Sequence, residues 1–136
     1  MSEPIIYVDH SAIRKGKLEE LRQAMTELAE FVDTHEPQLL SYGIFISEQA
    51  SRMTVIAIHP DAASVEYHMD ILEPRFRKYR ELVDLLAIDV YGEPSDKMLQ
   101  QLQQKAQTLG ESGSVAVHRL HAGFNRVGAQ TSNAPG

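Results

Sequence analysis

His68 is the side chain whose type and position most favour chemistry, because imidazole exchanges a proton near neutral pH. From Asp61 onward, Val65, Met69 and Leu72 recur at helical spacing. His68 lies at the margin of that apolar stripe, about 60° around the helix from Val65. The ring should therefore border the space between this helix and a sheet, as a general base or an orienting donor. A partly buried structural histidine, hydrogen-bonded to backbone, is the alternative.

Asp9 is the second catalytic candidate. It shares one face of the expected strand 5–13 with Ile5 and Tyr7. In a split βαβ arrangement the first and third strands are neighbours, and the second helix packs across them. The sequence therefore predicts a pocket in which His68 and Asp9 come within about 10 Å, since His68 is two turns into its helix. An aspartate at an exposed strand end is the alternative.

Four further side chains are candidates for binding a substrate: Tyr7, Tyr42, His59 and Tyr91. The tyrosines could instead be core aromatics with satisfied hydroxyls, and the histidine at the end of its strand could be structural. His118 and His121 are three residues apart, a spacing that sends them to opposite faces of a strand. No nucleophile elbow, phosphate loop or zinc pattern is present. We therefore expect no metal and no bound cofactor.

The spacing of apolar residues predicts the order β-α-β-β-α-β, followed by one more helix and strand. Glu73-Pro74 should break the second helix, with Pro74 opening a further turn. The third helix begins after the cap Ser95, and its solvated face is expected to consist of Gln100, Gln101, Gln103, Gln104 and Lys105. The expected strands are about 5–13, 39–47, 52–59, 85–92 and 115–124, and the expected helices are about 18–35, 61–72 and 96–109.

The predicted fold class is α+β, a ferredoxin-like antiparallel sheet with helices on one face. Its strands nevertheless carry apolar residues on both faces. In the strand 52–59, Val55 and Ala57 lie on one face, and Ile56 and Ile58 lie on the other. The second face must also be buried, most simply against the sheet of a second copy. One short extra helix could cover only part of it. The sequence therefore predicts a homodimer that forms through the sheet faces.

Composition sets the remaining bounds. The 136 residues carry a formal charge of −6, which argues against a nucleic-acid partner or an anionic membrane surface. The absence of cysteine suits a reducing, cytoplasmic location. No apolar run approaches a membrane span, and the N-terminus lacks a secretory pattern. We expect one domain over residues 1–127, with a core at 5–92, a helix–strand extension at 95–124 and a disordered tail at 128–136.

Three segments resemble the dimeric α/β-barrel superfamily and, within it, the antibiotic-biosynthesis-monooxygenase (ABM) domains. They are IRKGKLEELRQAM, with a glycine just before the first helix, THEPQLLSYGIF, and IAIHPDAASVEYHMD. The resemblance covers about residues 5–92, and Glu36-Pro37 and His68 are its most specific pieces. It implies a homodimer whose sheets face each other. It also implies oxygenation of quinol-like or polyketide phenols without metal or flavin, or, in other relatives, degradation of haem.

The resemblance carries over to single positions. Asp9 is the nearest match to a polar pocket residue on the first strand, and His68 falls where relatives have an aromatic on the second helix. No histidine stands near Lys78 and Tyr79, where the axial haem ligand of relatives lies, and tryptophan is absent. The implied function is a cofactor-independent monooxygenase acting on a small hydroxylated aromatic. The alternative is a non-catalytic barrel domain that binds a small molecule or serves a stress or regulatory role.

Overall fold

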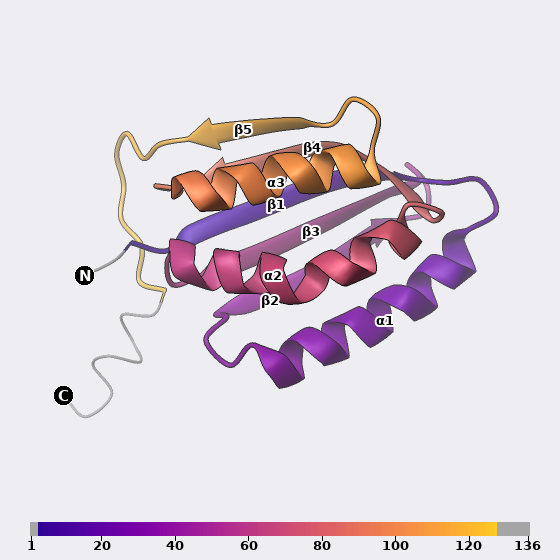
Figure 1. The fold of residues 1–136 in the computed structure, drawn as a ribbon, viewed down its shortest axis with the longest axis horizontal. Helices are drawn as coiled ribbons and strands as arrows, with labels where there is room; N and C mark the ends of the chain where they lie inside the picture. Colours follow the sequence, from indigo (N-terminus) through magenta and orange to yellow (C-terminus); the bar gives the residue numbers. More distant parts are fainter. Residues whose placement is uncertain (1–2, 128–136) are drawn as a thin grey trace.

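The computed structural model describes residues 3–127, which form one mixed sheet covered by helices on one side (Figure 1). The order of elements is the one that the sequence predicts. The strands are β1 (Ile5–Ile13), β2 (Ser41–Ser47), β3 (Arg52–His59), β4 (Val83–Tyr91) and β5 (Ser114–His118), and the helices are α1 (Leu18–His35), α2 (Ala62–Tyr79) and α3 (Asp96–Leu109).

The five strands lie in the order β2-β3-β1-β4-β5. The first four are antiparallel, whereas β5 runs parallel to β4, because α3 crosses over between them. The first four strands with α1 and α2 make the ferredoxin-like arrangement expected from the sequence. The central pair is β1 with β3, so the strand that carries Asp9 lies beside the strand that ends at His59.

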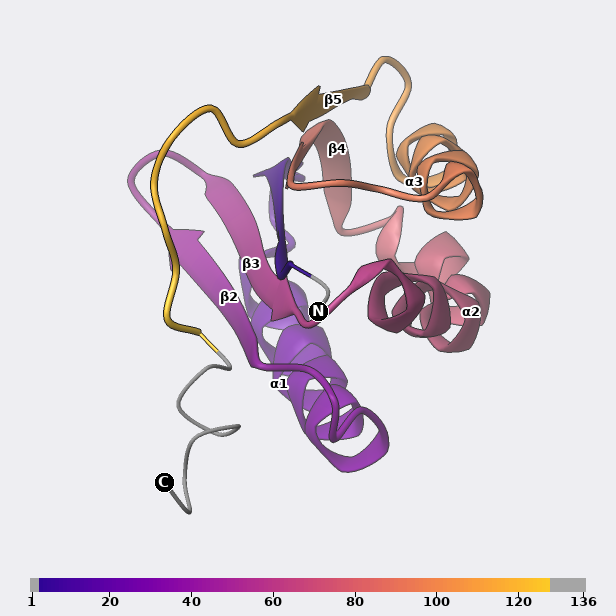
Figure 2. The same ribbon diagram turned by 90° about the vertical axis from the view of Figure 1, so that its left-hand side faces the viewer.

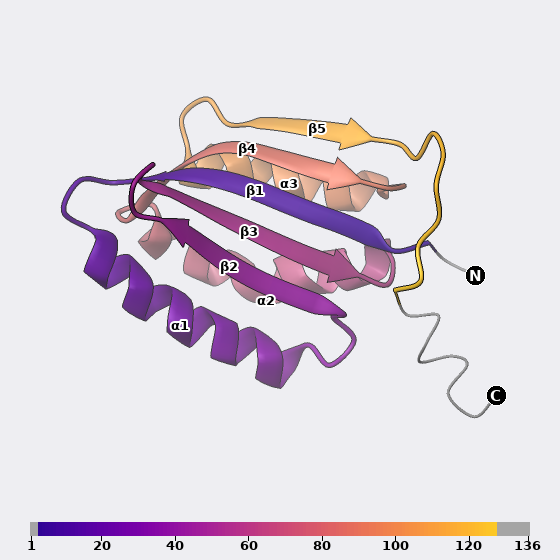
Figure 3. The same cartoon turned by 180° about the vertical axis from the view of Figure 1, so that it is seen from behind.

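All three helices cover the same face of the sheet, as the view from behind shows (Figure 3). Alternate residues of β1 are buried beneath them, starting with Ile5 and ending with Ile13. On α1 the buried residues recur at steps of three and four, which is the spacing that lays one apolar stripe on a sheet. Asp9 belongs to the buried parity, and its side chain therefore enters the helix-covered core.

No element within residues 3–127 covers the opposite side, which we call the open face (Figure 3). The extra helix α3 packs beside α2 and does not reach it. Large apolar side chains of the open face are therefore exposed: Ile6, Phe45, Ile56 and Tyr91.

Two boundaries differ by more than two residues from those that the sequence predicts. The helix α2 continues through Pro74 to Tyr79, because Phe76 and Tyr79 extend its buried stripe. Their burial outweighs the interior-proline cost of about 3 kcal/mol. The strand β5 ends at His118 rather than Phe124, because its partner β4 ends at Tyr91. The last residue pair between the two strands is Tyr91 with His118.

Among residues 3–127, no helix is both long and apolar enough to cross a membrane. The tail for which the sequence predicts disorder, 128–136, lies outside the described residues.

Candidate active site

The first buried polar group, the lysine cluster, consists of Tyr7, Asp9 and Lys105. The Lys105 ammonium donates to the Tyr7 hydroxyl at 2.6 Å and to the Asp9 carboxylate at 3.1 Å. The Tyr7 hydroxyl donates to the same Asp9 oxygen, Oδ2, at 2.5 Å. All three residues are buried, with Asp9 only 3% exposed. The cluster therefore places an ion pair in the core, directly beneath the helices.

Electrostatics keep the Tyr7 hydroxyl protonated. Burial, and after it the negative charge of Asp9, raise the pKa of Tyr7 well above its ordinary value. The second carboxylate oxygen of Asp9, Oδ1, is buried and has no hydrogen-bond partner among residues 3–127. A buried acceptor without a partner costs free energy unless a ligand or water donates to it. Oδ1 is thus a ready acceptor for a substrate hydroxyl.

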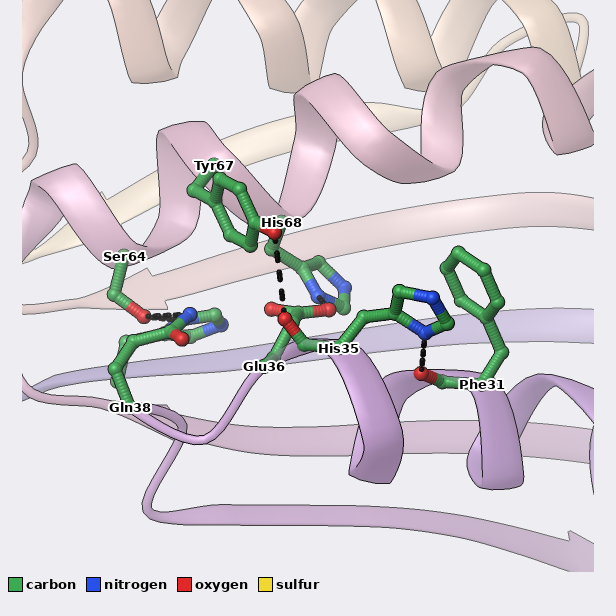
Figure 4. A network of polar contacts seen from close by, with 8 residues as sticks. Phe31, His35, Glu36, Gln38, Ser64, Tyr67 and His68 are labelled. Carbon is green, nitrogen blue, oxygen red and sulfur yellow. Dashed lines mark hydrogen bonds and ion pairs between the residues drawn. The ribbon is translucent and has the colours of Figure 1, made fainter.

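The second group, the histidine cluster, joins the end of α1 to α2 (Figure 4). His68 Nδ1 lies 2.6 Å from Glu36 Oε2, and both side chains are buried. Beside them, His59 Nδ1 lies 2.7 Å from the Ser64 hydroxyl, and the two imidazole ring centroids are 5.4 Å apart. Glu36 Oε1 is a second buried carboxylate oxygen without a partner in the described chain.

Local sequence explains why these side chains meet. The helix α1 ends at His35, and the Glu36 backbone N–H closes its last turn on Val32. At the other side Asp61 caps α2 by accepting from the Ser64 N–H, which fixes the first turn and turns the Ser64 hydroxyl towards His59.

The histidine cluster has the arrangement of a general base and its orienting carboxylate. A carboxylate on Nδ1 holds the imidazole in the tautomer with Nδ1–H, which leaves Nε2 to exchange a proton. His59 does not compete for that role, because burial, and after it the nearby His68, lower its pKa to about 3. Of the two rings, His68 is therefore the better candidate for a base.

Tyr42 lies between the two clusters. Its ring centroid is 5.5 Å from that of His68. Its pKa is raised by burial first and then by the charges of Asp9 and Glu36. It lines an internal cavity of about 40 Å³ together with Asp9, Ser11 and Lys105. It also lines an outer groove of about 230 Å³ that contains Glu36. The Tyr42 side chain is thus shared by the cavity and the groove.

A second groove, of about 300 Å³, runs between α2 and α3 and is lined by Lys105 and Phe76, which also line the cavity. The remaining lining of the cavity is mostly apolar side chains from the sheet and all three helices. A cavity of about 40 Å³ holds a few water molecules, whereas typical ligand sites are about 300 Å³ or larger. A substrate must therefore displace a lining side chain to enter.

The structure brings together most of the residues that the sequence singles out. Tyr7 and Asp9 belong to the lysine cluster, and Asp9 and Tyr42 line the cavity. His68 lies next to Tyr42, and His59 lies next to His68. The carboxylate paired with His68 is Glu36 rather than Asp9, whose charged partner is Lys105. The separation of about 10 Å between Asp9 and His68 stays a prediction.

Tyr91 is not part of this group. It lies on the open face, 42% exposed, and its ring stacks on His118 with centroids 4.6 Å apart. The His118 ring also contacts the Asp89 carboxylate at 2.8 Å. Among residues 3–127, no cluster of three or more histidines and carboxylates is arranged to hold a metal ion.

Sequence reasoning missed two residues of the site, Lys105 and Glu36. Lys105 was expected on the solvated face of its helix, which is wrong: it is 8% exposed. The signal was its spacing, seven residues after Met98 and three after Leu102, both fully buried. Glu36 looked like a helix end, and nothing local indicates that its carboxylate turns inward to His68.

No family model matches the chain, and no curated protein matches it. Among solved structures, MupZ from Pseudomonas fluorescens is similar, with a TM-score of 0.70 and 15% identity over 92% of this chain and 96% of its own. SO0527 from Shewanella oneidensis aligns with a TM-score of 0.58 and 23% identity over 67% of this chain and 91% of its own. PA3566 from Pseudomonas aeruginosa aligns with a TM-score of 0.57 and 20% identity over 66% of this chain and 93% of its own.

At these identities the likeness bears on the fold alone. The chain has the ferredoxin-like α+β fold that its sequence predicts.

Proposed function

We propose that the chain is an enzyme of acid–base chemistry, a cofactor-independent monooxygenase that acts on a small hydroxylated aromatic molecule. The observation that carries the proposal is the buried contact of 2.6 Å between Glu36 and His68. A base next to an apolar cavity is what such chemistry requires, because dioxygen accepts electrons from a phenolate far more readily than from a phenol. The resemblance of the sequence to ABM domains supports the same reaction class.

The reaction divides between the two clusters. His68 Nε2 accepts the phenolic proton, while Glu36 holds the imidazole through Nδ1 and stabilises the imidazolium that forms. The phenolate transfers an electron to dioxygen, and the two radicals combine as a peroxide anion at a ring carbon that bears a hydrogen. The His68 imidazolium returns its proton to this anion, which gives the hydroperoxide. Loss of water from the hydroperoxide then yields the quinone. One atom of dioxygen enters the product and the other leaves as water, so that phenol and dioxygen balance with quinone and water.

The lysine cluster orients the substrate. Asp9 Oδ1 accepts a hydrogen bond from a second substrate hydroxyl, and the Lys105 ammonium stabilises negative charge that develops on oxygen. The apolar side chains of the cavity exclude water, which favours electron transfer over protonation of the phenolate. In this proposal the Tyr42 ring turns aside and joins the outer groove to the cavity, so that one space holds a single aromatic ring.

The alternative, a binding domain without catalysis, calls for a cavity with a continuous apolar lining. Here the lining includes Asp9, Ser11, Tyr42 and Lys105. Convergent ionisable groups beside a base favour turnover over binding alone.

We also propose that the protein is a homodimer that pairs through the open face. Exposed Ile6, Phe45 and Ile56 form the centre of that face on β1, β2 and β3, where no helix of the described chain lies. A two-fold pair would bury both copies of this surface at once.

Oxygen uptake tests the proposed reaction. A panel of hydroquinones and polycyclic phenols is presented to the protein in an oxygen electrode, with protein-free autoxidation subtracted. His68→Gln should lower the rate by roughly a hundredfold or more, the usual effect of removing a general base. His35→Gln, a change at an exposed histidine outside both clusters and the open face, is the matched control and should leave the rate unchanged. Wild-type rates in His68→Gln would contradict the proposal.

A further inference from the structure

The segment after β5, residues 119–127, forms an arm with neither helix nor strand. It leaves β5, passes the end of the sheet where β1 begins and β3 ends, and lies on the side of the open face (Figures 2 and 3). Two polar contacts tie it to its own chain: Arg119 pairs with Glu93, and the Asn125 amide donates to Glu3 at 3.3 Å. The arm is therefore placed beside the open face without being packed on it.

Two large apolar side chains of the arm are mostly exposed to solvent. Leu120 is 70% exposed and Phe124 is 76% exposed, the two highest values among the large apolar residues of the described chain. The Phe124 ring does contact the guanidinium of Arg126, 4.2 Å from the ring centroid, but that contact lies within the arm. Leu120 and Phe124 are four residues apart, so the arm offers two large apolar side chains whose burial against a partner would be favourable.

Charge separates the arm from the rest of the chain. Arg119 and Arg126 lie in the arm, and residues 112–136 contain no aspartate or glutamate. Residues 1–111 therefore carry 11 lysines and arginines against all 19 acidic residues, a net charge of −8 that is opposite in sign to the arm's +2. An acidic protein body with an exposed apolar surface is a complementary partner for this arm, and a second copy of the chain supplies both.

We infer that the arm is an exchange arm: residues 119–127 of one copy bind across the open face of a second copy, which returns its own arm. Leu120 and Phe124 then pack against the exposed apolar residues of the partner's sheet, while the arginines are attracted by the net negative charge of the partner's residues 1–111. Two-fold symmetry makes the contact reciprocal, so each change in the arm acts twice in the dimer. The inference rests on the homodimer proposed above and is independent of the proposed reaction.

Sedimentation equilibrium of full-length protein measures the contribution of the arm. The double variant Leu120→Asp/Phe124→Asp should weaken the dimer by roughly a hundredfold or more, since each buried side chain of this size contributes about a tenfold change or more. The matched control is Tyr67→Asp, at a residue 44% exposed on α2, on the helix-covered side. An unchanged dissociation constant in the arm variant, or equal weakening in the control, would overturn the inference.

A mixed-label NMR experiment shows on which copy the arm lies. The chain has no cysteine, so Ala122→Cys, at an exposed position of the arm, accepts a single nitroxide and keeps both Leu120 and Phe124. Spin-labelled, unenriched protein is mixed with ¹⁵N-enriched wild type at a concentration where the dimer forms. Exchange predicts broadened amides in the enriched copy, strongest on the strands β1 to β3 and weakest on the outer face of α1.

Two results would refute the exchange arm. If the dimer forms but the mixed sample shows no broadening, while a chain labelled with both ¹⁵N and nitroxide does, the arm folds back on its own sheet. If the protein is a monomer at micromolar concentration, the homodimer itself fails, and sedimentation distinguishes that outcome from the first. Oxygen uptake enters neither test.

Discussion

Acidification should destabilise this protein through His59. The ring is 1% exposed and has a low pKa of about 3, because burial disfavours its charged form and His68 lies beside it. In the unfolded chain the same ring titrates near 6.5. Between these two values the unfolded state binds the extra proton, so the free energy of unfolding rises with pH and is lost as the pH falls below 6.5.

The size of the effect follows from the two pKa values. Between pH 7.5 and pH 5, His59 alone should lower the free energy of unfolding by about 2 kcal/mol, or about 1.4 kcal/mol for each pH unit well below 6.5. The loss continues until the folded-state ring also protonates, near pH 3. Carboxylates protonate in the same acidic range, so the contribution of His59 must be measured as a difference between two proteins.

The assay is urea denaturation of wild type and His59→Asn at several pH values between 7.5 and 5. Asparagine can keep the contact that His59 Nδ1 makes with the Ser64 hydroxyl, and it does not titrate. The variant should be less stable at pH 7.5, because ring contacts are lost, yet its stability should fall about 2 kcal/mol less than that of wild type by pH 5. His35→Gln, at an exposed histidine, should keep the pH dependence of wild type. Parallel curves for wild type and His59→Asn would refute the electrostatic account of this site.

Three further predictions concern the core, the open face and the cofactor content. Lys105→Met should lower the free energy of unfolding by about 3–5 kcal/mol, because it leaves the Asp9 charge unpaired in the core. Asp9→Asn/Lys105→Met should cost less than the two single changes together, and additive losses in urea denaturation would contradict the pairing. Ile56→Asp should raise the dimer dissociation constant by roughly a hundredfold or more, as measured by sedimentation, since an unpaired charge would enter a dry interface. The purified protein should show neither Soret nor flavin absorbance and no stoichiometric metal by elemental analysis; any of these would overturn the cofactor-free reaction.

The fold was predictable because each of its signals is local. Alternation along β1 and the steps of three and four along α1 mark a strand and a helix without knowledge of their neighbours. Pro74 and the end of β5 were not predictable in this way. The first depends on how much apolar surface α2 buries around the proline, and the second on where β4 stops offering backbone partners.

The site was predictable only in part, for the same reason. Strand parity alone places Asp9 and Tyr7 on one face, and helical spacing places His68 at the edge of a stripe. The pairing of His68 with Glu36 joins residues 32 positions apart, and that of Asp9 with Lys105 joins residues 96 apart. No local pattern encodes such contacts. A charged residue in an apolar stripe, as Lys105 is, shows that a partner must exist without showing which residue it is.

Oxygen-isotope labelling tests the central claim, monooxygenation with His68 as the base, most directly. A phenol that supports oxygen uptake is turned over under ¹⁸O₂ in unlabelled water, and the product is reduced at once so that its carbonyl oxygens cannot exchange. The account predicts one ¹⁸O atom in each product molecule formed by wild type. It also predicts that His68→Gln forms labelled product no faster than the protein-free control. Oxidised product without ¹⁸O, or label that arrives only from H₂¹⁸O, would contradict it.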